Sequence, residues 1–222
     1  MWHRIASWTL KGLAATGLAA SLSACNMVVT TEPTFLAEDQ GKPTLREGLW
    51  VNEEKDCKFD VKSDATKWPE CAHWIVVKDS AMTGVSEKGE AFKVPFILAA
   101  GDPRVLQIRI EDDKKAADGK AAALYLYMGL KALKTDKEGR IVSYSGWMVQ
   151  CGPPPPKDAK KPDGNPRYGT LEPSPGMIMD SDLSGCAPES KAALIKAAGL
   201  SEHFEDGGTN GENSRWVRDG DK

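Results

Sequence analysis

Apolar and polar residues alternate along several stretches in the middle of the chain, between residues 46 and 151. The clearest stretch is Leu106–Ile110, in which three aliphatic residues fall on one face and Gln and Arg lie between them. Residues 92–98 repeat this alternation, with Phe, Val, Phe and Leu on one face. A period of two with one apolar face is typical of a half-buried β-strand. The two stretches therefore predict two strands, and the Gly-Asp-Pro sequence between them predicts a hairpin-like turn.

Further strands are predicted from runs that are rich in β-branched and aromatic residues. These runs are Gly48–Val51, Trp74–Val77, Leu124–Met128 and Ile141–Gln150. The last two flank a polar turn that contains glycine, and they predict a long hairpin. Because Pro95 has no backbone N–H, we expect its strand to lie at a sheet edge. Strands that follow one another through short turns favour an antiparallel meander, folded as a barrel or a sandwich.

A proline-rich segment, residues 152–175, interrupts the β pattern. It holds eight of the 14 prolines in the chain. We expect a long exposed loop with polyproline character. The alternative is a recognition segment that docks in an aromatic groove of a partner.

One helix is predicted near the end of the chain, at about residues 188–199. Pro188 suits the first helical position, and Gly199 is placed to end the helix. Trp216-Val217 predicts either a last short strand or a docking anchor. The predicted fold is thus a single mainly β domain over residues 45–222, with one C-terminal helix and a long Pro-rich loop.

The first 24 residues have the features of an export signal, which is absent from a mature protein. Arg4 and Lys11 supply positive charge, and the small apolar stretch Ala14–Ala20 is too short to span a bilayer core of about 30 Å. The next residues are Leu22-Ser23-Ala24-Cys25. They resemble the lipobox of bacterial lipoproteins, in which the cysteine thiol receives a diacylglycerol and the signal is cut just before it. The resemblance implies a mature chain that begins at a lipid-modified Cys25.

Residues 25–44 show no sustained period and mix short apolar pieces with Pro, Gly and acidic residues. We expect a flexible tether between the lipid and the domain, about 25 Å from end to end for about 19 residues. The lipoprotein resemblance also implies a place in the cell envelope, facing the periplasm. Asn26 follows the cysteine, and in enteric bacteria a residue other than aspartate here favours the outer membrane, which is the membrane we expect.

Four cysteines remain when Cys25 is set aside, and an even number in an exported chain predicts two disulfides. Three pairings are possible. We favour Cys57 with Cys71 and Cys151 with Cys186, because each bond closes a polar, turn-rich segment.

Metal sites are only weakly indicated. A site that combines cysteines with His73 and His203 lacks the paired spacing of zinc ligands. A second segment matches the opening of a calcium loop, although its twelfth position is Lys191 instead of a glutamate. The calcium candidates are Asp180, Asp182, Ser184 and Glu189. The simpler interpretation is a polar turn whose short side chains bond to nearby amides.

Charge and motifs exclude several function classes. The chain has 29 Lys and Arg against 32 Asp and Glu, and it has no basic stripe that could bind nucleic acid. The hydrolase motifs Gly-x-Ser-x-Gly, Ser-x-x-Lys and His-Glu-x-x-His are absent. We expect His73 to be structural instead of catalytic. The sequence favours a non-enzymatic, membrane-anchored envelope protein without a cofactor, which binds a partner protein or joins an assembly; its oligomeric state is open.

Gly48-x-Trp50 opens the first confidently predicted strand and resembles the Gly-x-Trp of lipocalins, whose tryptophan closes the barrel base. Lipocalins have a meander barrel followed by a helix, and the resemblance implies an alternative function as a carrier of an apolar small molecule. The side chains that would line its cavity are Trp50, Phe92, Phe96, Leu106, Ile108, Leu124, Leu126 and Trp147. The competing interpretation is that these residues simply pack the core, because protein interiors are normally filled.

Overall fold

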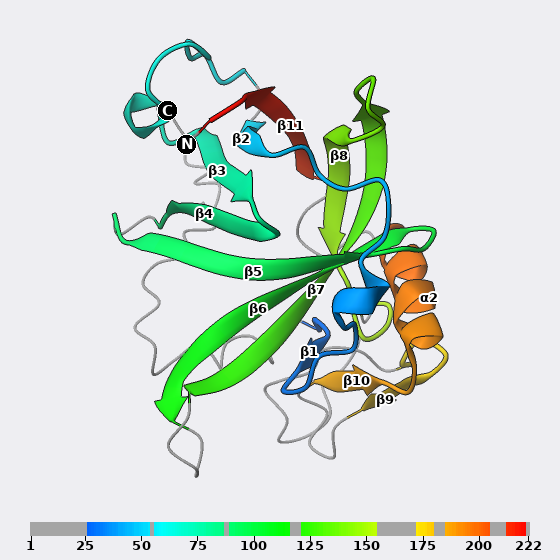
Figure 1. The fold of residues 1–222 in the computed structure, drawn as a ribbon. Coiled ribbons are helices and arrows are strands. Elements are labelled where there is room, and N and C mark those ends of the chain that lie inside the picture. Colours follow the sequence, from blue (N-terminus) through cyan, green and yellow to red (C-terminus); the bar gives the residue numbers. More distant parts are fainter. Residues whose placement is uncertain are drawn as a thin grey trace, which may run out of the picture.

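Eight antiparallel strands close into a barrel in the computed structural model, which describes residues 26–53, 56–86, 89–115, 121–154, 172–179, 185–204 and 212–220 (Figure 1). The barrel strands are β2 (Gly48–Glu53), β3 (Ala72–Lys78), β4 (Ala81–Val85), β5 (Ala91–Ala99), β6 (Arg104–Lys115), β7 (Ala121–Thr135), β8 (Ile141–Met148) and β11 (Glu212–Arg218). From β2 to β8 each strand pairs with the next along the chain, and β11 closes the ring between β8 and β2. The predicted mainly β meander is confirmed, as a barrel.

The strand that contains Pro95 is not an edge strand, so that prediction is wrong: β5 lies between β4 and β6. Its first half, Ala91–Pro95, pairs with β4, whereas its register with β6 begins at Phe96. The Phe96 N–H donates to the Ser80 carbonyl, on the β4 side, at 2.9 Å. Because successive N–H groups point to opposite sides, the Pro95 nitrogen faces the side where β6 has not yet joined. Its missing N–H therefore costs no ladder hydrogen bond.

Two apolar clusters lie on opposite faces of the barrel wall. The inner cluster fills the barrel and includes Trp50, Leu98, Leu106, Leu130 and Ile141. The outer cluster joins the wall to the elements packed on it, and it includes Val28, Phe35, Val105, Tyr127 and Leu194. Alternate residues of β5, β6 and β7 supply the two clusters in turn. This division explains why these strands have apolar residues on both faces.

The outer cluster is covered by helix α2 (Lys191–Ser201), which Figure 1 shows against the barrel wall. The predicted helix was about three residues too early. Ser190 caps α2 by accepting a hydrogen bond from the Ala193 N–H at 3.1 Å, and Gly199 lies inside the helix. Pro188 belongs instead to the short strand β10 (Cys186–Pro188). Among the described ranges, no helix is both long and apolar enough to cross a membrane.

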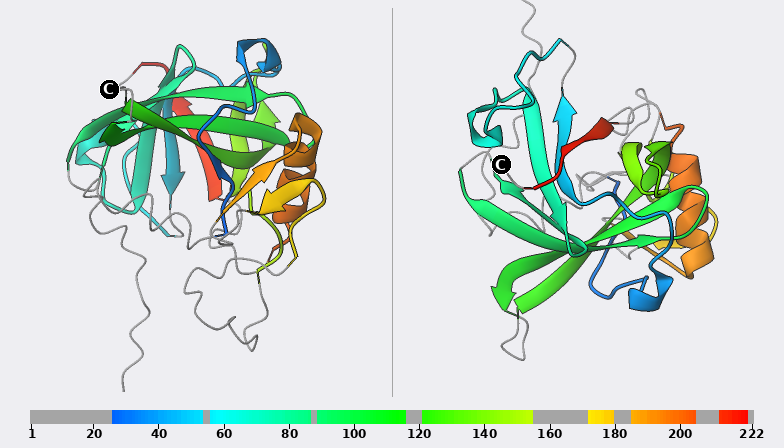
Figure 2. Two further views of the ribbon diagram at one scale, coloured as in Figure 1. Left: turned by 90° about the horizontal axis from the view of Figure 1, so that it is seen from below. Right: turned by 45° about the horizontal axis from the view of Figure 1, so that its top comes forward.

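Residues 26–44 form a strap across the outside of the barrel, so the expected flexible tether is wrong (Figure 2). The strap contains β1 (Val29–Thr30), which pairs with β7, and the 3-10 helix η2 (Ala37–Asp39). Val28 and Phe35 are buried in the outer cluster. Gln107 holds the strap by donating to the Phe35 carbonyl and accepting from the Phe35 N–H, at 2.9 and 2.8 Å. Side-chain bonds of this kind leave no periodic pattern in the sequence, which is why the segment resembled a tether.

Both favoured disulfide pairings are present. Cys57 bonds to Cys71 across the connection from β2 to β3, and Cys151 bonds to Cys186 at the start of β10. Strand β10 forms a hairpin with β9 (Met177–Met179) outside the barrel. Most of the predicted Pro-rich loop lies outside the described residues, as does the predicted lipidation site, Cys25.

The order of the last elements departs from the lipocalin resemblance. The helix does not follow the barrel but lies between its seventh and eighth strands, since α2 precedes β11 in the chain. Trp216-Val217 belongs to β11, so the alternative in which these residues form a last strand is confirmed.

Candidate functional site

One end of the barrel is filled by side chains around Trp50. The Trp50 side chain is 1% exposed, and its indole N–H donates to the Arg46 carbonyl at 2.8 Å. Its ring lies against Tyr144, with centroids 5.4 Å apart and planes tilted by 44°. Leu45 and Ile141 are buried in the same cluster. These contacts fix Trp50 inside the barrel, and we call this part of the barrel the filled end.

Arg46 ties three elements together at the filled end. Its guanidinium lies 3.6 Å from the centroid of the Trp216 ring on β11, in a cation–π arrangement. The same group pairs with Asp219 at 3.2 Å and with Asp136, in the turn between β7 and β8, at 3.6 Å. The Trp216 indole N–H donates to the Glu47 carbonyl at 2.9 Å. The start of β2, the end of β11 and the β7–β8 turn are thereby held in one polar network.

Asp136 is the most constrained carboxylate of this network. Partial burial raises its pKa, but hydrogen bonds from the Arg140 side chain and backbone outweigh that effect and leave the pKa below its ordinary value. The carboxylate also accepts a bond from the Glu138 N–H at 3.1 Å. Asp136 is therefore charged at neutral pH and fixes the turn at the filled end.

Burial of the inward-facing side chains falls steadily toward the opposite end of the barrel. On β6, Leu106 is 1% exposed, whereas Ile108 and Ile110, two and four residues further along, are partly exposed. The same change occurs on β5, β7 and β3. Partly exposed inward residues on these strands include Ile75, Phe92, Val94, Ile108, Ile110, Leu124 and Leu126, of which Ile75, Val94 and Ile108 also pack against the inner cluster. We call this set the mouth, because apolar side chains that face the barrel axis are accessible to solvent there.

At the mouth, β6 and β7 diverge from the first half of β5, as Figure 1 shows. The register between β5 and β6 runs only from Phe96 to Ala99, whereas β6 and β7 stay paired from Arg104 to Lys115. On the other side of β5, the Phe92 ring lies over Gly84, where a Cβ would force the ring to move. Gly84 thus allows a large apolar ring to lie flat at the rim.

The structure divides the predicted cavity residues into three groups. Trp50, Phe96 and Leu106 belong to the filled end. Four others belong to the mouth: Phe92, Ile108, Leu124 and Leu126. Trp147 faces the other way, and its assignment to the cavity is wrong. Its indole N–H donates to the Ala198 carbonyl of α2 at 2.8 Å, and its ring covers Gly129 on β7. Gly129, opposite it on β7, leaves room for the ring on the outer face.

Metal chemistry finds no support in the described ranges. The four cysteines that a site with His73 and His203 could draw on are all in disulfides, so none of them is a thiolate ligand. His73 is exposed at the start of β3. Of the calcium candidates, Asp180, Asp182 and Ser184 lie outside the described residues, and Glu189 is exposed just before α2. Nowhere in the described part of the chain do three or more His, Cys, Asp or Glu side chains gather in a possible metal site.

A groove lies on the outer face, between the strap and strands β5 to β7. It is an open groove of about 280 Å³ whose walls include Phe35, Leu36, Ile97, Arg109 and Tyr125. Pockets that enclose a drug-sized ligand usually measure 300–1,000 Å³ and bury most of its surface. This groove is too small and too open for that role, which leaves the mouth as the stronger candidate.

Comparison of the chain with protein-family models, with curated protein sequences and with solved structures gave no match. The site is accordingly interpreted from its own geometry.

Proposed function

We propose that the chain is a non-enzymatic, lipid-anchored binding protein of the bacterial envelope, whose barrel accepts the apolar part of a small molecule at the mouth. One observation carries the choice of ligand: inward-facing aliphatic and aromatic side chains remain partly exposed at one end of a barrel whose other end is filled. An eight-stranded barrel is just wide enough to hold one small ligand. Exposed apolar side chains that gather in one place commonly mark a binding site.

The anchor in this proposal rests on the lipobox-like residues that end at Cys25. Two or three acyl chains give lasting attachment, because each buried CH₂ contributes about 0.8 kcal/mol. We expect radiolabelled palmitate to be incorporated into the full chain in bacteria, and Cys25→Ser to abolish both the label and membrane retention. An unlabelled wild-type chain would remove the anchor from the proposal.

Binding at the mouth is tested by native mass spectrometry of the detergent-purified full chain. We expect a co-purifying apolar molecule, visible as mass above that of the lipidated chain. Leu126→Gln places an amide in the mouth and should weaken binding about tenfold if it removes about 1.4 kcal/mol of apolar contact. Leu133→Gln is the matched control, since Leu133 lies on the same strand but is 53% exposed.

Equal binding by the two variants would place the ligand elsewhere. A chain that carries no small molecule but co-purifies with an envelope protein would instead support the alternative expected from the sequence, an envelope assembly module.

A further inference from the structure

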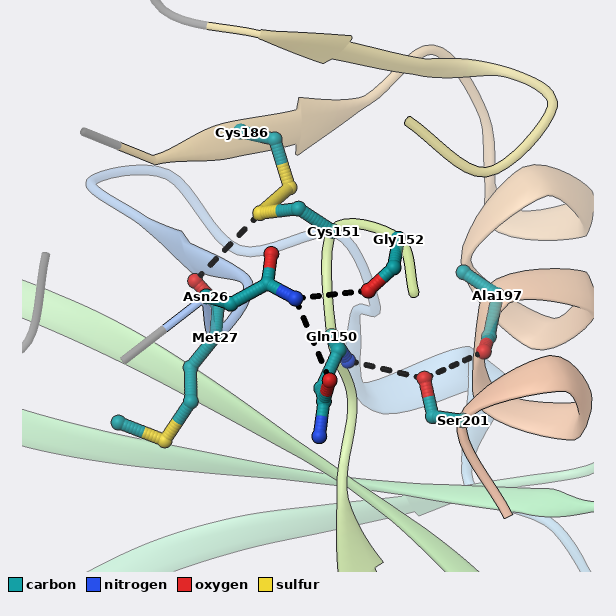
Figure 3. The surroundings of a disulfide bond; sticks show 8 residues. All are labelled: Asn26, Met27, Gln150, Cys151, Gly152, Cys186, Ala197 and Ser201. Carbon is teal, nitrogen blue, oxygen red and sulfur yellow. Dashed lines mark hydrogen bonds between the residues drawn. A yellow bond between two sulfur atoms is a disulfide. The ribbon is translucent and has the colours of Figure 1, made fainter. Parts of the chain in front are cut away.

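Asn26, the first described residue, is fixed against the barrel body. Its carbonyl accepts a hydrogen bond from the Cys151 N–H at 2.9 Å, and its side-chain amide donates to the Gly152 carbonyl at 2.7 Å and to Gln150 Oε1 at 3.2 Å. Figure 3 shows the two side-chain bonds of Asn26 beside the Cys151–Cys186 disulfide. Asn26 is only 8% exposed. Consecutive Cα atoms lie about 3.8 Å apart, so a lipid on Cys25 would be attached one residue from this fixed point.

The position of Asn26 along the barrel is set by its partners. Strand β8 begins at Ile141 in the filled end and runs toward the mouth, and Gln150 lies two residues beyond its last residue, Met148. Met27 forms a bridge with Gln150. The first described residue therefore lies beside the mouth-side end of β8, and the left view of Figure 2 shows the start of the described chain and the tip of β2 toward the same end.

An exposed apolar side chain lies on the same part of the surface. Ile178 on β9 is 56% exposed, and it pairs across the hairpin with Ala187, which is also exposed. The next residue of β10, Cys186, is joined to Cys151, the partner of Asn26. Single exposed aliphatic residues are common on protein surfaces. Next to a lipid-bearing residue, this one is placed to enter the boundary between lipid head groups and acyl chains.

We propose that the chain is held directly against the bilayer with its mouth end facing the lipid, so that the occupant of the mouth is an acyl chain of a phospholipid from that bilayer. The inference rests on the lipid anchor and the mouth of the proposed function. The inward side chains of the mouth are aliphatic and aromatic, which suits hydrocarbon and not a charged head group. Because the strap is packed on the barrel from its first described residue, it does not act as a flexible tether that would hold the domain away from the bilayer.

The test uses single engineered cysteines in the full lipidated chain. Four of the five native cysteines are in disulfides, and the fifth is Cys25, so each new thiol is labelled selectively. The variants His73→Cys and Ile178→Cys carry an environment-sensitive fluorophore at the mouth end. Lys78→Cys is the matched control on β3, about 17 Å along the strand from residue 73. The chain is reconstituted into phosphatidylcholine vesicles with and without bromine on the acyl chains.

Brominated lipid should quench most of the fluorescence at positions 73 and 178 and leave position 78 unchanged. Equal quenching at both ends, in a chain that sediments with vesicles, overturns the orientation but not the anchor. A chain that fails to sediment overturns the anchor itself. Native mass spectrometry after extraction from vesicles of one phospholipid should show that phospholipid bound to wild type and less of it bound to Leu126→Gln. Its absence from a chain that binds other apolar molecules overturns the assigned occupant.

A second variant isolates the role of Asn26. A flexible Gly/Ser segment of about 20 residues between Cys25 and Asn26 would span about 25 Å on average. We expect this variant to sediment with vesicles as before and to lose the quenching at positions 73 and 178. Quenching that survives the insertion overturns the claim that the short connection holds the mouth at the lipid.

Discussion

The two ends of the barrel are stabilised in different ways. At the filled end, Trp50, Leu106, Leu130 and Ile141 are buried together, and Arg46 links three elements through ion pairs and a ring contact. At the mouth, the inward side chains are partly exposed and bury less apolar surface. Both disulfides lie toward the mouth end: Cys57–Cys71 joins the end of β2 to the start of β3, and Cys151 follows the end of β8.

This difference shows how a barrel keeps an accessible apolar end. Apolar burial contributes about 25 cal/mol per Å² removed from water, so an end that is left open gives up part of that stabilisation. Covalent cross-links contribute without filling the interior, because they act mainly by restricting the unfolded chain. The mouth is thus supported from outside the barrel, and its inner surface is left for a ligand.

The largest expected effect comes from the disulfides. The double variant Cys151→Ala with Cys186→Ala opens a loop of 35 residues, and we expect it to lower the free energy of unfolding by roughly 4 kcal/mol. Cys57→Ala with Cys71→Ala opens a loop of 14 residues and should cost roughly 3 kcal/mol. Urea unfolding of both variants measures the costs. Wild-type stability in either variant would show that the mouth end does not depend on that cross-link.

The next effect compares leucines on one strand. Leu130→Ala leaves a cavity in the filled end and should cost roughly 2–5 kcal/mol. Leu126→Ala, in the mouth, should cost less than half as much, because the site is already open to solvent. Leu133→Ala is the exposed control and should change stability by less than about 0.5 kcal/mol. Urea unfolding measures these changes as shifts of the midpoint at a constant m-value. Equal losses of unfolding free energy for Leu130→Ala and Leu126→Ala would show that the mouth is packed as tightly as the filled end.

The smallest effect is a pH dependence that belongs to the filled end. Because the pKa of Asp136 is lower in the folded protein than in the unfolded chain, its contribution to stability is present above pH about 4 and is lost as the pH falls through the folded pKa. Asp136→Asn should therefore flatten the loss of stability below pH 4. Thermal unfolding between pH 2.5 and 6 measures it, and parallel curves for wild type and variant would contradict the assigned role. The pKa of Asp39 is lowered by the hydrogen bond from Lys191. Its contribution to acid stability can be compared with that of Asp136, because Asp39 lies outside the filled end.

Much of the barrel follows from local sequence. Strands β5 and β6 were predicted from their alternation of apolar and polar residues, because one face of each must be buried. Strand β3 was predicted from its run of aromatic and β-branched residues. Strand β4 was missed, since Ala81–Val85 is short and Gly84 breaks its pattern. The short strands β1 and β9 were missed for a related reason: two or three residues are too few to show a period.

The candidate site was only partly predictable. Alternation identifies Phe92, Ile108 and Leu126 as inward residues, but the difference between filled end and mouth depends on where β6 leaves β5. That divergence is a property of the closed ring and of its twist, which no single strand encodes. Trp147 was misplaced because an aromatic residue on a strand is equally suited to either face, and the outer face here is covered by α2.

The place of β11 in the chain also fixes the order in which the barrel can be completed. As the polypeptide is synthesised from its N-terminus, β2 through β8 emerge first, and the gap between β2 and β8 stays open until residue 218 has followed. During that interval both strands present free edges that can pair with another chain. A nascent chain stalled before residue 212 would be an open, aggregation-prone sheet. The barrel can therefore close only after the last strand has been added.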